Sequence, residues 1–472
     1  MDEYDCIVIG AGPVGENVAD RAVAGGLRTV IVERELVGGD CSYWACIPSK
    51  GMLRPGAALR AAAAVDGARQ AVTGGVDPAA VLRRRDAMVH GWDDAGQVEW
   101  VTGAGIDLIR GHARIDGPKR VTVTAADGTM RTLVARHAVA VCTGSDAAVP
   151  AIPGLREVEP WTSRDATGVR DVPASLAIIG GGVVACEMAT AFLDLGSTVT
   201  VIARGRLLGG QEPFAGELVG AALTARGASV RTGTGTSAVR RTPDGVAIEL
   251  ADGDVVTAER VLLATGRTPR TGDLGLDTVG LDPGAWLEVD DTMRVRGTDW
   301  LYGVGDVNHR ALLTHQGKYQ ARAAGDAIAA RAQGRAVDEA PWGAHVATAD
   351  HAAVPQVTFT DPEVASVGRT AADAAAAGLR TRVLDVDLGA LAGAGAHRDG
   401  YEGRARAVVD EDRGVLVGVT FVGPGVGEML QAATIAVTAE VPLSRLWHAV
   451  PAFPTLSEVW LRFLEAYGRP TP

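Results

Sequence analysis

Two glycine-rich segments, each set between short apolar runs, constrain the fold of this 472-residue chain more than any other feature. The first follows the apolar run Cys6–Ile9 and opens a helical pattern that extends to about Ala24. A second apolar run, Thr29–Val32, ends at Glu33, and the glycines of the loop are Gly10, Gly12 and Gly15. A unit of this kind binds a dinucleotide, because its glycines permit a tight turn and a close approach of the diphosphate. Glu33 stands where a carboxylate accepts hydrogen bonds from an adenosine ribose.

The same architecture is repeated after the apolar run Leu176–Ile179. The second loop contains Gly180, Gly182 and, in the place of the third glycine, Ala185. The strand expected at Thr198–Ile202 is followed by Arg204 and Arg206 rather than by a carboxylate. Two arginines can pair with the 2′-phosphate of NADPH, so this site is predicted to prefer NADPH over NADH. If both arginines are only surface residues, either dinucleotide binds.

Two of the five cysteines, Cys41 and Cys46, follow the first dinucleotide unit, five positions apart. Such thiols form a disulfide if their Cα atoms lie about 4.4–6.8 Å apart, and a flavin beside them can exchange two electrons with the pair. The first unit is therefore expected to hold FAD, although the spacing alone also fits two structural cysteines. Lys50 is one of only three lysines among 45 basic residues, which suggests a role for its compact ammonium group.

Composition excludes several classes of function. The formal net charge of −12 argues against nucleic acid or an anionic membrane as a partner, and no apolar run reaches the roughly 18 residues of a membrane span. The acidic segment Met1–Asp5 runs directly into a strand, so no signal peptide is expected, and no metal site is predicted. The few scattered cysteines predict a cytoplasmic protein. We expect three of them to be inert packing residues: Cys6, Cys142 and Cys186.

After about Ala340 the pattern changes to antiparallel strands and helices, which predicts a third, α+β domain. With these features the chain resembles the two-dinucleotide-binding-domain flavoprotein disulfide reductases, which include glutathione reductase, dihydrolipoamide dehydrogenase and mercuric reductase. Further motifs carry the resemblance along the whole chain: Thr143-Gly144, Ala264–Arg267, Tyr302–Asp306, Phe359–Glu363 and Phe453–Glu458. The resemblance implies an α/β fold with two Rossmann-like domains and a C-terminal dimerisation domain. The expected ranges are 1–150 and 271–345 for FAD, 151–270 for NAD(P)H, and 346–472 for dimerisation.

The resemblance also implies roles for individual residues. Cys46 would lie nearer the flavin and Cys41 would face the substrate, while Lys50 and Glu187 would form an ion pair where hydride arrives. The expected FAD-binding residues are those of the first loop with Glu33, Gly39, Asp40, Lys50, Ala113, Thr143, Gly144, Asp306, Thr314 and His315. The remaining expected cofactor-binding residues are those of the second loop with Arg204, Arg206, Gly266 and Arg267. Family members are homodimers in which the Phe453–Glu458 segment reaches the cysteine pair of the partner subunit.

The chain departs from the family pattern at the catalytic base. The family has a histidine that holds Cys41 as a thiolate, whereas this chain has Phe453 there and keeps the orienting Glu458. Loss of a positioned acid–base group costs ~10²–10⁴ in rate. Three interpretations stay open: His448 replaces the base, the substrate is a disulfide with a good leaving group, or the acceptor is not a disulfide. Between the cysteines, Tyr43 and Trp44 either shape the substrate pocket or pack against the first helical turn.

The sequence thus predicts an enzyme that passes electrons from NADPH through FAD and the Cys41–Cys46 disulfide to a small acceptor, in the first place a disulfide. A quinone or other non-disulfide acceptor is one alternative, and a slowly reacting FAD-binding sensor or partner subunit is another. Because no cysteine follows Cys186, mercuric reductase and large thioredoxin reductase activities are disfavoured. Phe453 and the NADPH-type arginines disfavour dihydrolipoamide dehydrogenase activity.

Overall fold

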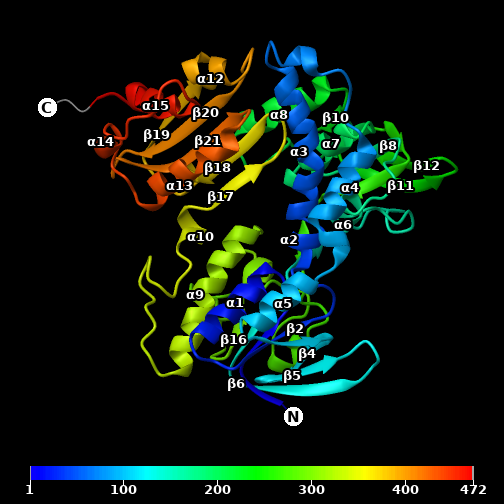
Figure 1. Cartoon of the computed structure of the whole chain (residues 1–472), viewed down its shortest axis with the longest axis vertical. Coiled ribbons are helices and arrows are strands. Elements are labelled where there is room, and N and C mark those ends of the chain that lie inside the picture. Colours follow the sequence, from blue (N-terminus) through cyan, green and yellow to red (C-terminus); the bar gives the residue numbers. More distant parts are fainter. Residues whose placement is uncertain (1, 470–472) are drawn as a thin grey trace. The chain divides into compact units, whose positions relative to one another are not determined.

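The computed structural model describes residues 2–469, which divide into two compact units (Figure 1). Unit 1 contains the residues up to Pro48 together with 86–148 and 267–350, and unit 2 contains 49–85, 149–266 and the residues from His351 onward. Each unit is therefore assembled from three separate stretches of the chain. Among the residues described, none of the helices has both the length and the apolar character needed to cross a membrane.

Unit 1 is built on a sheet with the strand order β3-β2-β1-β6-β5-β4, and β16 also pairs with β6. The pairs that join β3, β2, β1, β6 and β16 are parallel, whereas β4 and β5 extend β6 in antiparallel fashion. The strands are β1 (Asp2–Ile9), β2 (Thr29–Glu33), β3 (Asp107–Arg110), β4 (His112–Gly117), β5 (Arg120–Thr124), β6 (Met130–Val141) and β16 (Leu301–Gly303). The central strands are almost continuously apolar, as expected for parallel strands that are covered on both faces.

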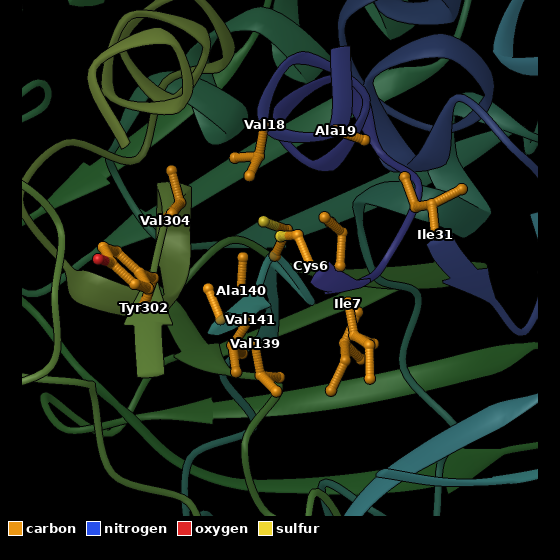
Figure 2. Close-up of a cluster of buried hydrophobic side chains, with 14 of the residues drawn as sticks. Cys6, Ile7, Val18, Ala19, Ile31, Val139, Ala140, Val141, Tyr302 and Val304 are labelled. Atoms are coloured by element: carbon orange, nitrogen blue, oxygen red, sulfur yellow. The ribbon is translucent and has the colours of Figure 1, made fainter. Parts of the chain in front are cut away.

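The core of unit 1 lies between this sheet and two helices, α1 (Pro13–Ala24) and α9 (Thr314–Ala332). Figure 2 shows Ile7 of β1 and Val139 of β6, which are paired in register, on one side of the sheet, and Val18 of α1 beyond the other side. The two helices approach closely because α9 carries a glycine at the contact: a Cβ at Gly325 would lie 2.5 Å from the Cβ of Arg21. The strand–loop–helix–strand unit predicted at residues 6–33 is confirmed.

Unit 1 also contains the short elements that carry the site: α2 (Gly39–Tyr43), α5 (Ala95–Gly103), β7 (Ser145–Ala147) and β15 (Arg267–Pro269). Strands β7 and β15 pair with each other in antiparallel fashion. The helix α3 (Cys46–Ala63) begins in unit 1 and continues into unit 2. It places Cys46 at its first position and Lys50 one helical turn later.

Unit 2 contains the second dinucleotide unit, a parallel sheet with the strand order β10-β9-β8-β14. An antiparallel sheet β11-β12-β13 belongs to the same unit. These strands are β8 (Ser175–Ile179), β9 (Thr198–Ala203), β10 (Ser229–Thr232), β11 (Thr236–Thr242), β12 (Gly245–Leu250), β13 (Val255–Ala258) and β14 (Arg260–Leu263). Its helices are α4 (Pro78–Met88), which ends just beyond the unit boundary, α6 (Ser163–Thr167), α7 (Val183–Asp194) and α8 (Pro213–Ala225).

The third predicted domain is an antiparallel sheet with the order β17-β18-β21-β20-β19, also in unit 2. Its strands are β17 (Pro355–Thr358), β18 (Glu363–Gly368), β19 (Thr381–Asp387), β20 (Arg404–Asp410) and β21 (Val415–Gly423). The helices here are α10 (Ala349–Ala352), which begins just before the unit boundary, α11 (Ala371–Ala376), α12 (Ala392–His397), α13 (Leu430–Thr438), α14 (Leu443–Leu446) and α15 (Val459–Tyr467). Two dinucleotide-type sheets, each with parallel central strands, and one α+β domain confirm the predicted fold class.

Candidate active site

The first glycine loop forms a cradle of backbone atoms at the carboxyl end of β1. Gly10 has φ +100°, and a Cβ there would lie 2.6 Å from the carbonyl oxygen of Cys142. At Gly12 a Cβ would lie 3.9 Å from the Cα of Gly39, in ordinary van der Waals contact. A Cβ at Gly39 would lie only 2.8 Å from the Cα of Gly12, so these two glycine backbones pack closely against each other. A tight glycine loop of this kind, at the carboxyl end of a parallel strand and the start of a helix, fits the diphosphate of FAD.

Glu33 holds this cradle in shape from the end of β2. Its Oε2 accepts a hydrogen bond of 2.7 Å from the backbone N–H of Ala11, and its Oε1 accepts one of 2.7 Å from Glu35. The backbone N–H of Gly111 donates to the carbonyl of Glu33, which brings the start of β4, with the buried Ala113, next to the end of β2. The structure thus places Glu33 and Ala113, two of the residues expected to bind FAD, on neighbouring segments.

A polar network gathers the remaining expected FAD residues of unit 1. The hydroxyl of Ser145 donates to Asp306, and the guanidinium of Arg267 donates to the Ser145 carbonyl at 2.6 Å. The Thr143 hydroxyl donates to the carbonyl of Arg270 at 2.8 Å, and the N–H of Arg270 donates to the Gly144 carbonyl at 3.0 Å. Gly266, the last residue of its stretch in unit 2, directly precedes Arg267.

Cys41 of α2 and Cys46 of α3 are free, half-buried thiols that hydrogen-bond to each other. That hydrogen bond and burial raise the pKa of the Cys41 thiol, while a weaker interaction with Thr314 lowers it. The Sγ of Cys46 lies 3.3 Å from the Thr314 hydroxyl, at the first residue of α9. The N-terminus of a helix favours negative charge, so Thr314 lies where a thiolate at Cys46 is stabilised. His315 follows on α9 and is exposed.

The other three cysteines have no such surroundings. Burial raises the pKa of Cys6 and of Cys186 to about 12, and it raises the pKa of Cys142 as well. A thiol in this state is protonated and inert at neutral pH. Burial therefore supports the expectation that these three residues only pack.

Tyr43 and Trp44, which separate the two cysteines, differ in their surroundings. Tyr43 is fully buried, and its hydroxyl contacts the side chain of Gln97 on α5 at 3.2 Å. The indole N–H of Trp92 donates to the Tyr43 carbonyl. Tyr43 therefore anchors α2 to its own unit, in agreement with the packing interpretation. Trp44 is half-buried, with its ring tilted against that of Tyr43 at 5.7 Å between centroids.

In unit 2, Lys50 and Glu187 form the ion pair implied by the resemblance. The Nζ of Lys50 lies 2.7 Å from Oε2 of Glu187, whose side chain is only 6 % exposed. The other carboxylate oxygen, Oε1, accepts a hydrogen bond of 3.0 Å from the backbone N–H of Phe359. The ammonium group of Lys50 also lies 4.7 Å from the centre of the Phe359 ring. The loop between β17 and β18 thus contacts both groups. The backbone of Phe359 holds the carboxylate, and the ring of Phe359 makes a cation–π contact with the ammonium.

The second glycine loop has the geometry expected for a dinucleotide. A Cβ at Gly180 would lie 2.1 Å from the carbonyl oxygen of Ala264, whereas a Cβ at Gly182 would have nothing within 4 Å. Ala185 is fully buried in α7, where it lets helix and sheet pack closely. The two arginines after β9 differ. Arg206 donates to the carbonyls of Gly209 and Gln211 at 2.6 and 2.8 Å, so its guanidinium braces its own loop. Arg204 is exposed and has no polar partner within residues 2–469.

The segment at the histidine position has an unexpected arrangement. Phe453 is 75 % exposed, and His448 is exposed and without a side-chain partner in the described part of the chain. The Oε1 of Glu458 accepts hydrogen bonds from the N–H groups of Thr455 and Gly393, at 3.2 and 2.9 Å. Glu458 is therefore the buried carboxylate of a capping box at the start of the short 3-10 helix Leu456–Glu458, which runs directly into α15, and this contact explains its presence without a histidine to orient.

Sequence reasoning missed three contacts at these sites. Thr314 touches Cys46 across 268 positions, and Phe359 touches Glu187 across 172. Arg270 pairs with Asp40 across 230 positions. Spacing along the chain carries no signal for such pairs. In the described residues, no group of three or more His, Cys, Asp or Glu side chains is arranged to hold a metal ion.

Glu16, in the first turn of α1, is a buried carboxyl beside the first loop. Its Oε1 has no hydrogen-bond partner among the described residues. Burial raises the pKa of Glu16 to about 7, and Glu33 adds to this effect while Lys318 opposes it. In the unfolded chain the pKa is near 4.5. Ionisation of Glu16 therefore opposes folding, and the folded state loses stability as the pH rises through about 7.

We expect Glu16→Gln to remove this pH dependence. At pH 5 the melting temperature should stay close to that of the unmodified protein, since Glu16 is protonated in the folded state. At pH 8 the variant should be more stable by up to about 3 kcal/mol, because the amide carries no charge to bury. Thermal melts of both proteins at the two pH values measure the difference. An equal effect at both pH values would mean that Glu16 is not neutral in the folded protein.

Comparison with known proteins supplies the family. Residues 4–334 match the profile described as pyridine nucleotide-disulphide oxidoreductase, and residues 354–462 match the dimerisation domain of the same family. A mercuric reductase of Acidithiobacillus ferrooxidans is 34% identical over 97% of this chain and 81% of its own length. A dihydrolipoyl dehydrogenase of Halobacterium salinarum is 31% identical over 98% of this chain and 95% of its own length.

Two solved structures show the same fold. The HOCl-induced flavoprotein disulfide reductase RclA of Escherichia coli, as a Cu(II) complex, superposes with a TM-score of 0.83 at 21% identity, over 98% of this chain and 99% of that one. LpdA of Mycobacterium tuberculosis superposes with a TM-score of 0.82 at 23% identity, over 99% of this chain and 100% of that one. By its full-length match, the chain belongs to the pyridine nucleotide-disulphide oxidoreductase family, whose members are enzymes that use FAD and NAD(P)H.

Proposed function

We propose that this enzyme uses NADPH to reduce a small disulfide through the Cys41–Cys46 pair. The observation that carries the proposal is the pair itself: two half-buried thiols in mutual contact, with Cys46 against the N-terminus of α9. The other cysteines are buried and protonated, so no other thiol of the chain competes for this role.

FAD, when bound, supplies the two-electron exchange between a nicotinamide dinucleotide and the dithiol. The chain's own part at the hydride side is to hold a charge pair in a fixed position. Both oxygens of Glu187 are engaged, one by Lys50 and one by the backbone of Phe359. Because α3 begins at Cys46 and carries Lys50 in its next turn, one helix links the disulfide to this ion pair.

The disulfide exchange uses the two thiols in turn. Cys41 loses its proton and forms a bond to one sulfur of the substrate, whose other sulfur leaves and takes up a proton. Cys46 then loses its proton and bonds to the sulfur of Cys41, which restores the Cys41–Cys46 disulfide. The second product thiol leaves with that proton. Two electrons and two protons thus move from the dithiol to the substrate.

The raised pKa of Cys41 makes its deprotonation the demanding step. Phe453, where the family has a histidine, supplies no proton acceptor. This observation favours a second candidate function, the reduction of a quinone or another acceptor that needs no thiolate. Mercuric reductases are among the relatives, but no cysteine follows Cys186 in this chain, so we do not extend that activity to it.

Three further features belong to the proposal. The exposed Arg204 would pair with the 2′-phosphate of NADPH, with Arg206 shaping the loop that presents it. The domain ranges 1–150 and 271–345, 151–270, and 346–472 would act as FAD, NADPH and interface domains of a homodimer. The active site would be shared between chains, with Phe453 facing the cysteines of the partner subunit. The cytoplasmic location expected from cysteine usage stays a prediction.

An anaerobic titration with NADPH, with NADH in parallel, tests the proposal. The first equivalent of NADPH supplies two electrons, which should open Cys41 and Cys46 to alkylation, as mass spectrometry detects, and a second equivalent should then bleach the flavin. NADH should require a higher concentration for the same effect. Flavin that stays oxidised and cysteines that stay closed to alkylation in an excess of NADPH would contradict the enzyme function and favour a sensor or partner subunit. Bleaching without new alkylation would contradict the role of the disulfide.

A further inference from the structure

Beside the first glycine loop, Asp40 pairs with Arg270, a residue to which the family resemblance assigns no role. Asp40 follows Gly39, whose backbone packs closely against Gly12. Its carboxylate is 25% exposed and lies 3.3 Å from Nη2 of Arg270. The side chain of Arg267 also approaches Asp40, at 3.7 Å. A carboxylate thus stands beside the surface that fits the FAD diphosphate, with a guanidinium against it.

Arg270 is held firmly in this position. Its side chain is only 16% exposed, and its guanidinium also lies 2.6 Å from Asp146. The backbone of Arg270 is fixed on both sides by Thr143 and Gly144, at the carboxyl end of β6. Strand ends at this edge of the sheet are where a dinucleotide binds.

The charges explain why the pair is needed. A diphosphate brings negative charge to the loop, and a carboxylate beside it repels that charge. Three carboxylates and two guanidinium groups form the local network: Asp40, Asp146, Asp306, Arg267 and Arg270. Without Arg270, the carboxylate of Asp40 beside the loop would keep only the more distant Arg267, at 3.7 Å, as a cation within this network.

We propose that Arg270 is a cofactor-binding residue that neutralises Asp40 and thereby allows the FAD diphosphate to bind. Asp40 and Arg270 then form an interdependent pair, in which the arginine is required because the aspartate is present. This inference rests on FAD as the cofactor and not on the identity of the acceptor. FAD binding can therefore fail or succeed independently of the proposed reaction.

The test is a double-mutant cycle on the full-length apoprotein, with FAD binding followed by flavin fluorescence. Arg270→Asn should raise the dissociation constant of FAD by about 10- to 100-fold, because a carboxylate is left beside the diphosphate. Asp40→Asn should lower the dissociation constant of FAD, because it removes the carboxylate that repels the diphosphate. The double variant should bind FAD nearly as well as the unmodified protein. A double variant as weak as Arg270→Asn would overturn the proposal, and so would normal binding by Arg270→Asn.

Two further measurements separate this role from a merely structural one. The loss in Arg270→Asn should shrink only modestly at high salt, since the carboxylate of Asp40 is 25% exposed and its repulsion of the diphosphate is only partly screened. Arg270→Lys should restore most of the affinity, because it keeps the positive charge. As a control, Asp146→Asn removes the other carboxylate that pairs with Arg270 and leaves the Asp40–Arg270 pair in place, so it should change FAD binding less than about threefold. No rescue by lysine would contradict the electrostatic role.

Discussion

Cys41→Ser is expected to lower disulfide reduction to background, a loss of at least about 10³-fold, while quinone reduction stays within a factor of about two. A serine hydroxyl cannot form the bond to Cys46 that closes the exchange. Its oxygen is also protonated throughout the accessible pH range. Electrons that leave the flavin directly for a quinone do not need Cys41. NADPH oxidation with a matched panel of disulfides and quinones measures both activities.

The control for this variant is a cysteine with no access to substrate. Cys6→Ala removes a fully buried thiol from β1 and should leave both activities in place. Equal loss of disulfide and quinone reduction in Cys41→Ser would show that quinones also draw electrons through the dithiol. Retention of disulfide reduction would contradict the proposed function directly.

Phe453→His is expected to increase disulfide reduction. Removal of a positioned acid–base group costs ~10²–10⁴, so restoring it should recover at least about tenfold. The exposed ring at position 453 leaves room for an imidazole. The gain should follow the titration of a histidine, near pH 6.5, because the neutral imidazole is the form that takes the proton from Cys41. The pH profile of kcat/KM for a disulfide measures this dependence.

Two variants define the origin of any gain at position 453. Phe453→Ala removes the ring without adding a base, so an equal increase in both variants would point to steric relief. His448→Ala should leave disulfide reduction unchanged, since the structure gives His448 no contact that directs it to the cysteines. A large loss in His448→Ala would instead identify His448 as the substitute base.

Much of the fold was predictable because its signals are local. The glycine loops at Gly10 and Gly180 each combine a buried strand, a turn that only glycine permits and a helix start within a few positions. Three strands of the antiparallel sheet after residue 340, β17, β20 and β21, were likewise visible as β-rich runs, whereas β18 and β19 were not. Such features depend on neighbours along the chain, and the structure confirms them at nearly the expected residues.

The site was predictable only for residues that lie within a recognisable sequence motif. Cys41, Cys46 and Lys50 lie within one segment, so their proximity followed from the sequence. The contact of Cys46 with Thr314, and that of Glu187 with Phe359, join segments more than 170 positions apart. These contacts depend on tertiary packing, which composition and periodicity do not encode. The role of Glu458 could not be predicted from the sequence either, because a glutamate can serve equally as a buried cap or as a group that orients a catalytic histidine.

The cap formed by Glu458 bears on how this enzyme can change over evolutionary time. Because its carboxylate holds the backbone at Thr455 and Gly393, the segment keeps its shape whichever residue stands at position 453. A Cβ at Gly393 would lie 2.1 Å from the Thr455 carbonyl carbon, so this packing tolerates little variation. Position 453 is thus free to mutate while its scaffold is not. A substitution there should therefore leave the fold of this segment intact.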